Sequence, residues 1–560
     1  MEFTYQKNDN VKLFKSVLGT NSINVSCPQN YTPIYENFFT LSQKNHNIIN
    51  LNNKNRVLEV KHKITSNTFL CAVEDNGEKD IELFFKYSPL IDPAKYLIGK
   101  YDITDKKLLQ LPSFGTNIAS DKAKDPNNSA YVDGFFTYLT SKLLHSHKFI
   151  HAIDFYGSFL ASKINFECNI ADDIEYLNDS SFFHKNKGNL FKIENDFANQ
   201  MFNFDTRQNK ERIKMDELQN NEELLELSNI SDLHKLDTMF KTTLEISENS
   251  KPIDLLFSYD ISGNIITDES SSDCSSRSSI TELDDENMDT ETNSETNSDG
   301  STATEDIMIA TIPSFPVNVI SMEKCYSTLD KLIVEKGEKM RDDEWGSMMI
   351  QVIMMLLAYQ KTYNLTHNDL HTNNIMYVKT DEKFLYYKAI DSYYKVPTFG
   401  RIYKIIDFGR AIYSFRGNVI CSDSYHPGGD AATQYNFEPY FNKNKPLVGP
   451  NYSFDLCRLG CSLIDFIDDD EHTEGKTNDA KRIIQEWCED DKGRNVLYKK
   501  NGEERYPNFK LYKMIARTVH NHTPELELNK KYFSKFRVSK KKIDKNIVIM
   551  NIDELPSYIA

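Results

Sequence analysis

The sequence lacks long apolar runs and any regular cysteine pattern. No stretch reaches the roughly 18 consecutive apolar residues of a membrane-spanning helix, and residues 1–20 form neither an apolar signal core nor an arginine-rich transit segment. The nine cysteines are odd in number and widely spaced, without a Cys-x2-Cys pair. This pattern offers no disulfide framework or zinc site and is typical of a reducing compartment. We therefore expect a soluble cytoplasmic protein without a membrane span.

The sequence also has fewer basic than acidic residues. The chain has 66 Lys and Arg against 83 Asp and Glu, which gives a formal net charge of −17 at pH 7. Nucleic acids and anionic membranes select basic faces, so this balance argues against a nucleic-acid partner. With 560 residues, 39% of them hydrophobic, the chain can form two domains or one large domain with insertions.

Residues 56–86 predict a small antiparallel sheet. Its strands are short β-branched or aromatic runs at 57–60, 68–73 and 81–85, with Asp75-Asn76-Gly77 as a hairpin connection. A helix is expected at Ala130–Leu144, where the apolar residues share one face, and further strands at 149–160 and 317–322. Residues 1–55 are then an N-terminal extension.

Residues from about 161 to 312 are expected to be an insertion between two of these strands. Within it, Thr267–Asp306 holds thirteen acidic residues and one basic residue, Arg277. Such a Ser/Thr-rich acidic tract cannot bury enough apolar surface to offset its ordering entropy, so we expect it to be disordered. It is either a phosphorylatable or partner-binding tail, or an inert solvated loop.

A long helix is predicted at Asp342–Tyr363. It is apolar on nearly every side, which places it in the middle of a domain. A polar loop follows at 365–374, then a short strand at 375–378, and later an apolar strand that ends at Asp407-Phe408-Gly409. A turn after the helix would direct Asp369 and Asn374 into one cleft.

These residue types match the needs of phosphoryl transfer. A carboxylate must orient the accepting hydroxyl and take its proton, oxygen ligands must hold Mg²⁺, and a lysine must hold the phosphates. The order His367-x-Asp369-x4-Asn374, followed by Asp407-Phe408-Gly409, resembles the catalytic loop and the metal-binding motif of protein kinases. The resemblance implies ATP as phosphate donor, Asp369 as catalytic base, and Asn374 and Asp407 as ligands of Mg²⁺ or Mn²⁺.

The same resemblance assigns the nucleotide-binding residues. Lys86, at the end of a predicted strand, corresponds to the lysine that holds the α- and β-phosphates, with Lys61 and Lys63 of the preceding strand as rivals. Met322 corresponds to the gatekeeper. The hinge that follows, with Glu323 and Cys325, would bind adenine through its backbone.

Two further residues are implied as structural supports. Asp455, in a segment similar to the Asp-x-Trp-Ser-x-Gly helix start of the family, would brace the catalytic loop. His367 would pack rather than carry a proton.

Three departures from the family pattern stand out. No Gly-x-Gly-x-x-Gly precedes Lys86, so a loop over residues 61–69 would approach phosphates less closely and nucleotide affinity would be modest. The acid partner of Lys86 is not obvious, and Asp133 is either that partner or a surface residue. Asn368 replaces the usual arginine, which implies that no activation-loop phosphate is needed. Residues 410–450 would form the activation and substrate loop.

The motif at 367–374, the run at 85–93 and Tyr452-Ser453-Phe454-Asp455 are similar to the divergent serine/threonine kinases of large DNA viruses, of the mimivirus and poxvirus type. This resemblance implies an α+β, two-lobed fold. An antiparallel-sheet N-lobe would span 56–325, including the insertion, and a helical C-lobe 326–560. It also implies a protein substrate and a location in the infected cell's cytoplasm or in the virion.

Two other functions fit the same residues. Asp369-Leu370-His371 with Asn374 also resembles aminoglycoside and choline phosphotransferases, although these usually lack the Phe-Gly pair. The absent glycine loop would also suit a pseudokinase that acts as a binding scaffold, although such proteins commonly lose the base or a metal ligand. Serine and tyrosine hydroxyls ask the same chemistry of Asp369, so only the resemblance favours serine/threonine.

Overall fold

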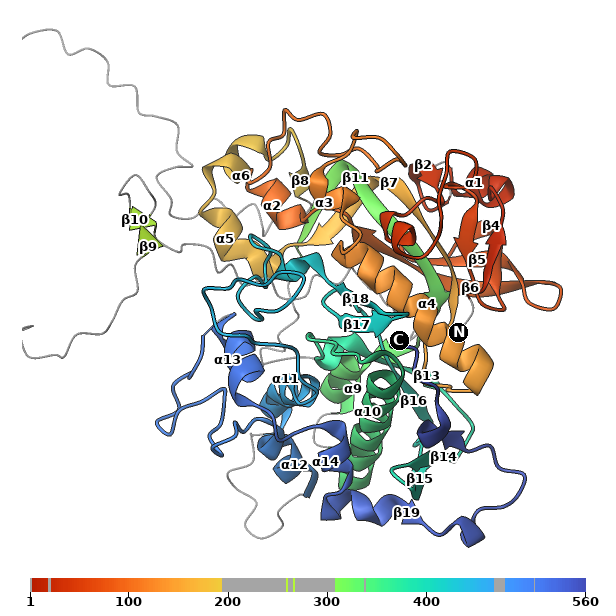
Figure 1. Cartoon of the computed structure of the whole chain (residues 1–560), viewed down its shortest axis with the longest axis vertical. Helices are drawn as coiled ribbons and strands as arrows, with labels where there is room; N and C mark the ends of the chain where they lie inside the picture. The colour runs from red at the N-terminus through yellow and green to blue at the C-terminus, as the bar shows by residue number, and fades with distance from the viewer. Residues whose placement is uncertain are drawn as a thin grey trace, which may run out of the picture. The chain divides into compact units, whose positions relative to one another are not determined.

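The computed structural model describes residues 3–18, 22–193, 258–259, 265–266, 308–336, 339–467, 479–507 and 509–560. The fold is α+β, with a curled antiparallel sheet and a set of helices (Figure 1). Internal contacts divide the chain into residues 1–204 with 272–560, and residues 205–271. In the second unit, the short strands β9 (Ser258–Tyr259) and β10 (Ile265–Ile266) pair antiparallel. The acidic tract at 267–306 lies outside the described residues.

The main sheet has the strand order β2-β7-β11-β6-β5-β4, with β8 paired to β11, and every pairing is antiparallel. Its strands are β2 (Val25–Gln29), β4 (Arg56–Lys63), β5 (Thr68–Glu74), β6 (Glu78–Pro89), β7 (Phe155–Asn169), β8 (Lys192–Ile193) and β11 (Ile309–Glu323). The predicted hairpin joins β5 to β6. Its turn places Asn76 and Gly77 at φ values of 54° and 137°, which these two residue types tolerate best. The predicted three-stranded sheet is confirmed.

Helix α4 (Ser129–His147) packs against β7 and β11 (Figure 1). Asn128 caps it by accepting a hydrogen bond from the N–H of Ala130. Asn318 of β11 donates to the Ala130 carbonyl at 2.8 Å, and a Cβ at Gly134 would lie 2.7 Å from the Asn318 amide nitrogen. Glycine therefore permits the close approach of the helix to the sheet, and the predicted helix at 130–144 is confirmed.

The sheet extends beyond its expected limits on both sides. Strand β7 continues to Asn169 and stays paired with β11, so residues 161–169 belong to the sheet and not to an insertion. Residues 1–55 contribute β2 to the sheet, as well as β1 (Tyr5–Lys7), α1 (Val11–Val17) and β3 (Ile49–Leu51). Smaller helices complete this part of the chain: α2 (Pro93–Leu97), α3 (Asp121–Lys124), α5 (Ile174–Asn178) and α6 (Ser181–Asn186).

The later part of the chain is organised around α10 (Asp342–Tyr363), which has the predicted bounds and is buried along nearly its whole length. It ends at Asn364, whose left-handed φ of 54° is a common C-terminal cap for asparagine. The other helices are α9 (Leu329–Lys336), α11 (Phe454–Leu463), α12 (Asp479–Trp487), α13 (Lys510–Thr518) and α14 (Pro524–Leu528).

This part was expected to be mainly helical, with strands only at 375–378 and ahead of Asp407, but it contains three small sheets. Aromatic and β-branched runs such as 384–387 favour strands over helices, which accounts for the difference. The sheets consist of β12 (Ser327–Thr328), β13 (Ile375–Lys379) and β16 (Arg401–Ile405); of β14 (Phe384–Ala389), β15 (Ser392–Pro397), β19 (Arg537–Val538) and β20 (Met550–Asn551); and of β17 (Ile412–Phe415) and β18 (Asn418–Cys421).

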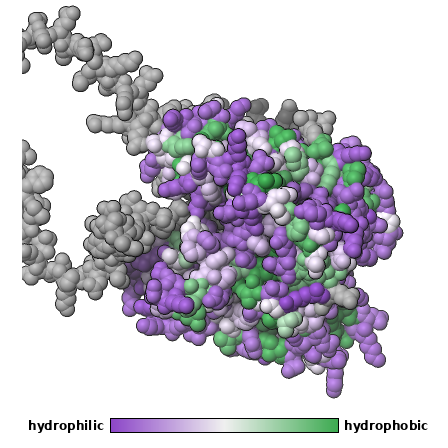
Figure 2. Space-filling model, turned by 45° about the horizontal axis from the view of Figure 1, so that its top comes forward, coloured by the Kyte–Doolittle hydropathy of each residue, from purple (hydrophilic) through white to green (hydrophobic). Residues whose placement is uncertain are grey.

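Apolar side chains are collected in the interior. Figure 2 shows a mostly hydrophilic face on which hydrophobic residues occur in small separate groups. None of the helices in the described ranges combines the length and the apolar character needed to cross a membrane.

Candidate active site

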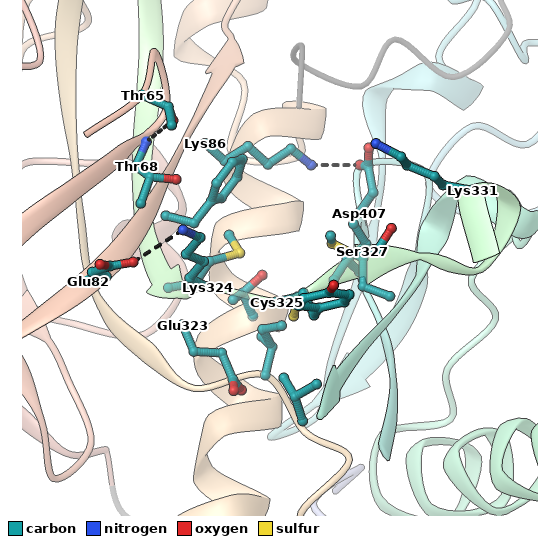
Figure 3. Close-up of a pocket in the computed structure, with 18 of the residues that line it drawn as sticks. Thr65, Thr68, Glu82, Lys86, Glu323, Lys324, Cys325, Ser327, Lys331 and Asp407 are labelled. Carbon is teal, nitrogen blue, oxygen red and sulfur yellow. Dashed lines mark hydrogen bonds and ion pairs between the residues drawn. The ribbon is translucent and has the colours of Figure 1, made fainter. Parts of the chain in front are cut away.

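A cavity of about 530 Å³ lies between the sheet and the segments that follow it. Strands β5 and β6 line one side, and residues from α9, β13 and the end of β16 line the other (Figure 3). Six of the residues predicted from the sequence line this cavity: Lys86, Asp133, Met322, Glu323, Cys325 and Asp407.

Lys86 is held between two carboxylates. Its Nζ lies 2.8 Å from Oδ2 of Asp133 on α4 and 2.9 Å from Oδ1 of Asp407, the latter pair drawn in Figure 3. Burial alone would lower the pKa of Lys86, but Asp133 and Asp407 outweigh burial and raise it. The side chain is therefore a cation at neutral pH, and it joins three separate elements of the fold.

Asp133 links α4 to the segment after β16. Its Oδ1 accepts the N–H of Phe408 at 2.8 Å, while its Oδ2 also accepts the hydroxyl of Ser88 at 3.3 Å. The side chain is only 2% exposed, so the surface interpretation of Asp133 is wrong. The structure instead places it where the acid partner of Lys86 was expected.

The Asp407-Phe408-Gly409 segment has an unusual backbone. Asp407 has a φ of 63°, in the left-handed region that residues other than glycine rarely adopt. Gly409 is not among the residues with positive φ. Phe408 is fully buried, with its ring 4.6 Å from that of Phe136 and 5.3 Å from that of His367. The special conformation therefore belongs to the aspartate, and buried packing holds it.

Asp455 holds the loop that carries Asp369. It is fully buried at the start of α11 and accepts the N–H groups of His367 and Asn368 at 2.9 and 2.8 Å. Burial raises the pKa of Asp455, although His367 and the two N–H bonds oppose that shift. This geometry matches the bracing position predicted for it.

His367 is held through both ring nitrogens. Its Nε2 lies 2.9 Å from the carbonyl of Ile406, which can only accept, so Nε2 carries the proton. Nδ1 is then the acceptor for the N–H of Asp369 at 3.3 Å. Both nitrogens are used by the backbone, which is the packing position expected from the sequence.

Asp369 is a buried, ionised carboxylate. Its Oδ1 accepts the hydroxyl of Tyr512 at 2.9 Å, and Nε of Arg410 lies 4.0 Å from Oδ2. Burial would raise the pKa of Asp369, but Arg410, His371, Arg458 and the Tyr512 bond together lower it to about 2. The group is therefore negative throughout the physiological pH range.

Asn374 presents an oxygen without a partner. Its Nδ2 donates to the Asp369 carbonyl at 2.9 Å, whereas its buried Oδ1 has no hydrogen-bond partner among the described residues. The N–H of Ile406 donates to the Asn374 carbonyl at 3.0 Å, so Asn374 and Asp407 lie at the same end of the β13–β16 pair. An unsatisfied buried acceptor beside a carboxylate suits a hard cation.

The described ranges contain no group of three or more His, Cys, Asp and Glu side chains that could hold a metal ion. A closed protein cage is therefore not formed by these residues. Mg²⁺ commonly takes one or two protein oxygens and completes its shell with water and substrate phosphates, and Asn374 with Asp407 fits that arrangement.

The hinge segment offers backbone rather than side-chain groups. Glu323 Oε1 lies 2.5 Å from Nζ of Lys404 and accepts the N–H of Asp154 at 2.7 Å, so its carboxylate is already engaged. Cys325 lines the cavity, and its N–H has no hydrogen-bond partner within the described part of the chain. The Cys325 thiol is buried, and burial raises its pKa.

In the turn between β4 and β5, backbone N–H groups donate hydrogen bonds to other residues of the same turn. The N–H groups of Ile64 and Thr65 donate to the Thr68 carbonyl at 2.9 and 3.1 Å. Those of Asn67 and Thr68 donate to Oγ1 of Thr65 at 3.3 and 3.0 Å. A glycine-rich loop would leave such groups for phosphates, whereas four of them are bonded within this turn.

The rival lysines are not in the cavity. Lys61 forms an exposed ion pair with Asp80 at 2.7 Å, and neither Lys61 nor Lys63 is among the lining residues. Of these three lysines, Lys86 is the one that lines the cavity.

Several residues at the site were missed. Arg410 lies next to Asp369 and pairs through Nη2 with Asp430 at 2.6 Å, while Tyr512 reaches Asp369 from α13. Asn368 accepts the hydroxyl of Tyr435 at 2.7 Å and donates to the Arg410 carbonyl at 3.1 Å. Arg410 adjoins the Asp-Phe-Gly motif and could have been singled out, but no sequence signal points to Tyr512, 143 residues from its partner.

A smaller cavity of about 140 Å³ opens next to the first. It shares Lys86, Asp133 and Asp407 with the larger cavity and adds Asp369 and Arg410. The site thus combines a buried cation between carboxylates, an amide oxygen with no partner among the described residues, and an ionised carboxylate in an adjoining opening. Such an arrangement can hold an anionic ligand with its metal ion and present a second reactant to Asp369. In comparisons with known proteins, no family model and no curated protein matches this chain.

Proposed function

We propose that the chain is an ATP-dependent serine/threonine protein kinase of the divergent type found in large DNA viruses. One observation carries the proposal: Lys86 lies between Asp133 and Asp407, in a site that also holds Asn374 and Asp369. The β2–β11 sheet with α4 would be the N-lobe, and the part built around α10 the C-lobe. Action in the cytoplasm of an infected cell or packaging in a virion belongs to the same proposal.

The nucleotide would occupy the larger cavity. The N–H of Cys325, which has no partner among the described residues, would supply a donor for the adenine edge, and Met322 also lines the cavity. Lys86 is positioned to donate to the phosphates, since a phosphate oxygen can replace one of its two carboxylate partners. Asn374 and Asp407 would hold Mg²⁺, which neutralises charge on the β- and γ-phosphates when bound.

The accepting hydroxyl would enter through the smaller cavity, beside Asp369. A carboxylate with a pKa of about 2 is a weak base towards a neutral hydroxyl. Its first role is therefore to orient the hydroxyl, and it takes the proton late, as the bond to the phosphorus forms in a loose transition state.

The other two functions make different demands. A pseudokinase would be expected to have lost the base or a metal ligand, whereas Asp369, Asn374 and Asp407 are all present and grouped. A small-molecule kinase would use the same loop, but the Phe408 packing and the Asp455 brace follow the protein-kinase pattern to which the sequence is similar.

The test is transfer of labelled γ-phosphate with Mg²⁺, offered to casein and myelin basic protein and, in parallel, to aminoglycosides and choline. The control is Asp407→Asn, which keeps the shape of the side chain and removes its charge. We expect incorporation into protein serine or threonine by the wild type and a loss of roughly a hundredfold or more in the variant. Equally little incorporation by both proteins would refute enzymatic function, and transfer only to small acceptors would refute the protein-kinase assignment.

A further inference from the structure

A third cavity, of about 70 Å³, lies against the opposite face of β6. Neighbouring residues of a strand point to opposite faces of a sheet, so Lys86 lines the nucleotide cavity and Tyr87 lines this one. Ser66 from the β4–β5 turn and Lys163 from β7 complete two of its other walls. The proposed kinase chemistry makes no use of these residues.

Two hydroxyls in this cavity lack partners. The Tyr87 side chain is 4% exposed, and neither its hydroxyl nor that of Ser66 has a hydrogen-bond partner within the described ranges. Buried hydroxyls are nearly always satisfied in folded proteins. Two of them lining one small cavity indicate a polar ligand.

The charge of the cavity indicates the sign of that ligand. Lys163 Nζ lies 5.0 Å from the centre of the Tyr87 ring and donates to the Ile164 carbonyl at 3.3 Å, but it pairs with no described carboxylate. Burial lowers the pKa of Lys163 to about 8, with Lys63 adding to this shift and Glu167 opposing it. The lining thus holds two lysines against one exposed glutamate, Glu167.

We propose that this cavity binds one tetrahedral oxyanion of the phosphate class. Lys163 and Lys63 would supply charge, and the hydroxyls of Tyr87 and Ser66 would donate hydrogen bonds to its oxygens. A volume of about 70 Å³ suits a single such group. The group is either free phosphate or the phosphate of a modified side chain whose backbone stays outside.

Such a ligand would act on the nucleotide site through the shared turn. Thr65 and Thr68 line the nucleotide cavity, and Ser66, between them in sequence, lines the anion cavity. The Asn67 carbonyl accepts the N–H of Phe85 at 2.8 Å, which ties the turn to β6. An anion bound between the β4–β5 turn, β6 and β7 would make this turn, which has no glycine and borders the nucleotide cavity, more rigid. This coupling, unlike the binding itself, rests on the proposed function.

The test is calorimetric titration of the full chain, in chloride buffer without nucleotide, with inorganic phosphate and separately with a phosphoserine peptide. Lys163→Met is expected to raise the Kd by roughly tenfold or more, since it removes a charged donor, and Tyr87→Phe by about two- to tenfold. The matched control is Lys61→Met, which removes the same charge from β4 outside the cavity and should leave the Kd within about twofold. Tyr87→Phe keeps the ring, so it remains informative if Lys163→Met fails to fold.

Tighter binding of the peptide identifies a modified side chain as the source, and tighter binding of inorganic phosphate identifies the free ion; either supports the site. Absence of saturable binding, or an equal loss in Lys61→Met, overturns it. Nucleotide affinity is then measured with and without the bound anion and should rise a few-fold with it. Saturable anion binding in a chain that binds no nucleotide would contradict the proposed function and leave the anion site standing.

Discussion

The loop at 365–374 and the β4–β5 turn border two adjoining cavities and are held in different ways. In the loop at 365–374, buried side chains far apart in sequence bind the backbone, as Asp455 does for His367 and Asn368. In the turn, the N–H groups bond to Thr65 and Thr68 of the same turn. The loop that carries Asp369 is thus held by contacts from remote parts of the chain, while the turn above Lys86 is held mainly by its own hydrogen bonds.

Among the variants that compare these two regions, Lys86→Met should have the largest effect on transfer. The substitution removes the only lysine that the structure places between the two carboxylates, and it leaves Asp133 and Asp407 in mutual repulsion. We expect the initial rate of phosphate transfer to fall by roughly a hundredfold or more. Lys61→Met, at an exposed ion pair on β4, is the control and should transfer at the wild-type rate. A similar loss in both variants would show that Lys86 has no special role.

Asp455→Asn tests whether Asp455 holds the loop at 365–374 in place. An amide keeps one acceptor oxygen but turns an NH₂ group toward one of the two backbone N–H groups, so one bond is lost inside the protein. We expect a free energy of unfolding lower by about 1–3 kcal/mol in urea titrations, and a transfer rate about tenfold lower because the loop shifts.

Asp381→Asn, at an exposed carboxylate, is the matched control and should change neither quantity. If Asp455→Asn behaves like this control, the brace does not hold the loop.

The low pKa of Asp369 should be visible in the stability of the protein at acid pH. The folded pKa of about 2 lies below the ordinary value of 3.8, so ionisation of this group stabilises the fold above pH 3.8 and the contribution is lost as the pH falls through about 2. The shift corresponds to about 2 kcal/mol. In acid-unfolding measurements, Asp369→Asn should lack this part of the pH dependence. An identical pH dependence in the two proteins would contradict the low pKa.

Tyr512→Phe should have the smallest effect. It removes the hydroxyl that donates to Asp369 and keeps the ring that packs near Arg410 and Arg458. The pKa of Asp369 should rise slightly, and kcat should change by less than about tenfold, with KM for ATP unchanged. A loss as large as that of Lys86→Met would make Tyr512 part of the chemistry.

The sequence predicted the elements whose signals are local. Strands β4–β6, the Asn76-Gly77 turn and the bounds of α10 follow from periodicity and turn chemistry. In the later part of the chain, β13 and β16 were predicted, whereas strands such as β14 and β15 were missed because their short aromatic runs lie in a segment without a clear period. The continuation of β7 to Asn169 was missed because its pairing partner lies some 140 residues later.

The residues of the candidate site also divide into those with a local sequence signal and those without one. Residues carried by motifs, such as Asp369 and Asp407, could be named from the sequence, and both line the smaller cavity. Asp133 could be named only as one of two alternatives, because the sequence does not show which face of α4 meets Lys86. Tyr512 and the pairing of Arg410 with Asp430 arise from tertiary packing alone, which no local pattern encodes.

The most direct measurement is to follow nucleotide binding and single-turnover phosphate transfer on the same preparation of Asp369→Asn. The side chain is not among the residues that line the larger cavity, so Mg²⁺-dependent binding of ATP should stay within a few-fold of the wild type. Transfer should fall by roughly a hundred- to ten-thousandfold, the range expected on loss of a general base. Equal transfer by both proteins, or the loss of ATP binding together with transfer, would contradict the role assigned to Asp369.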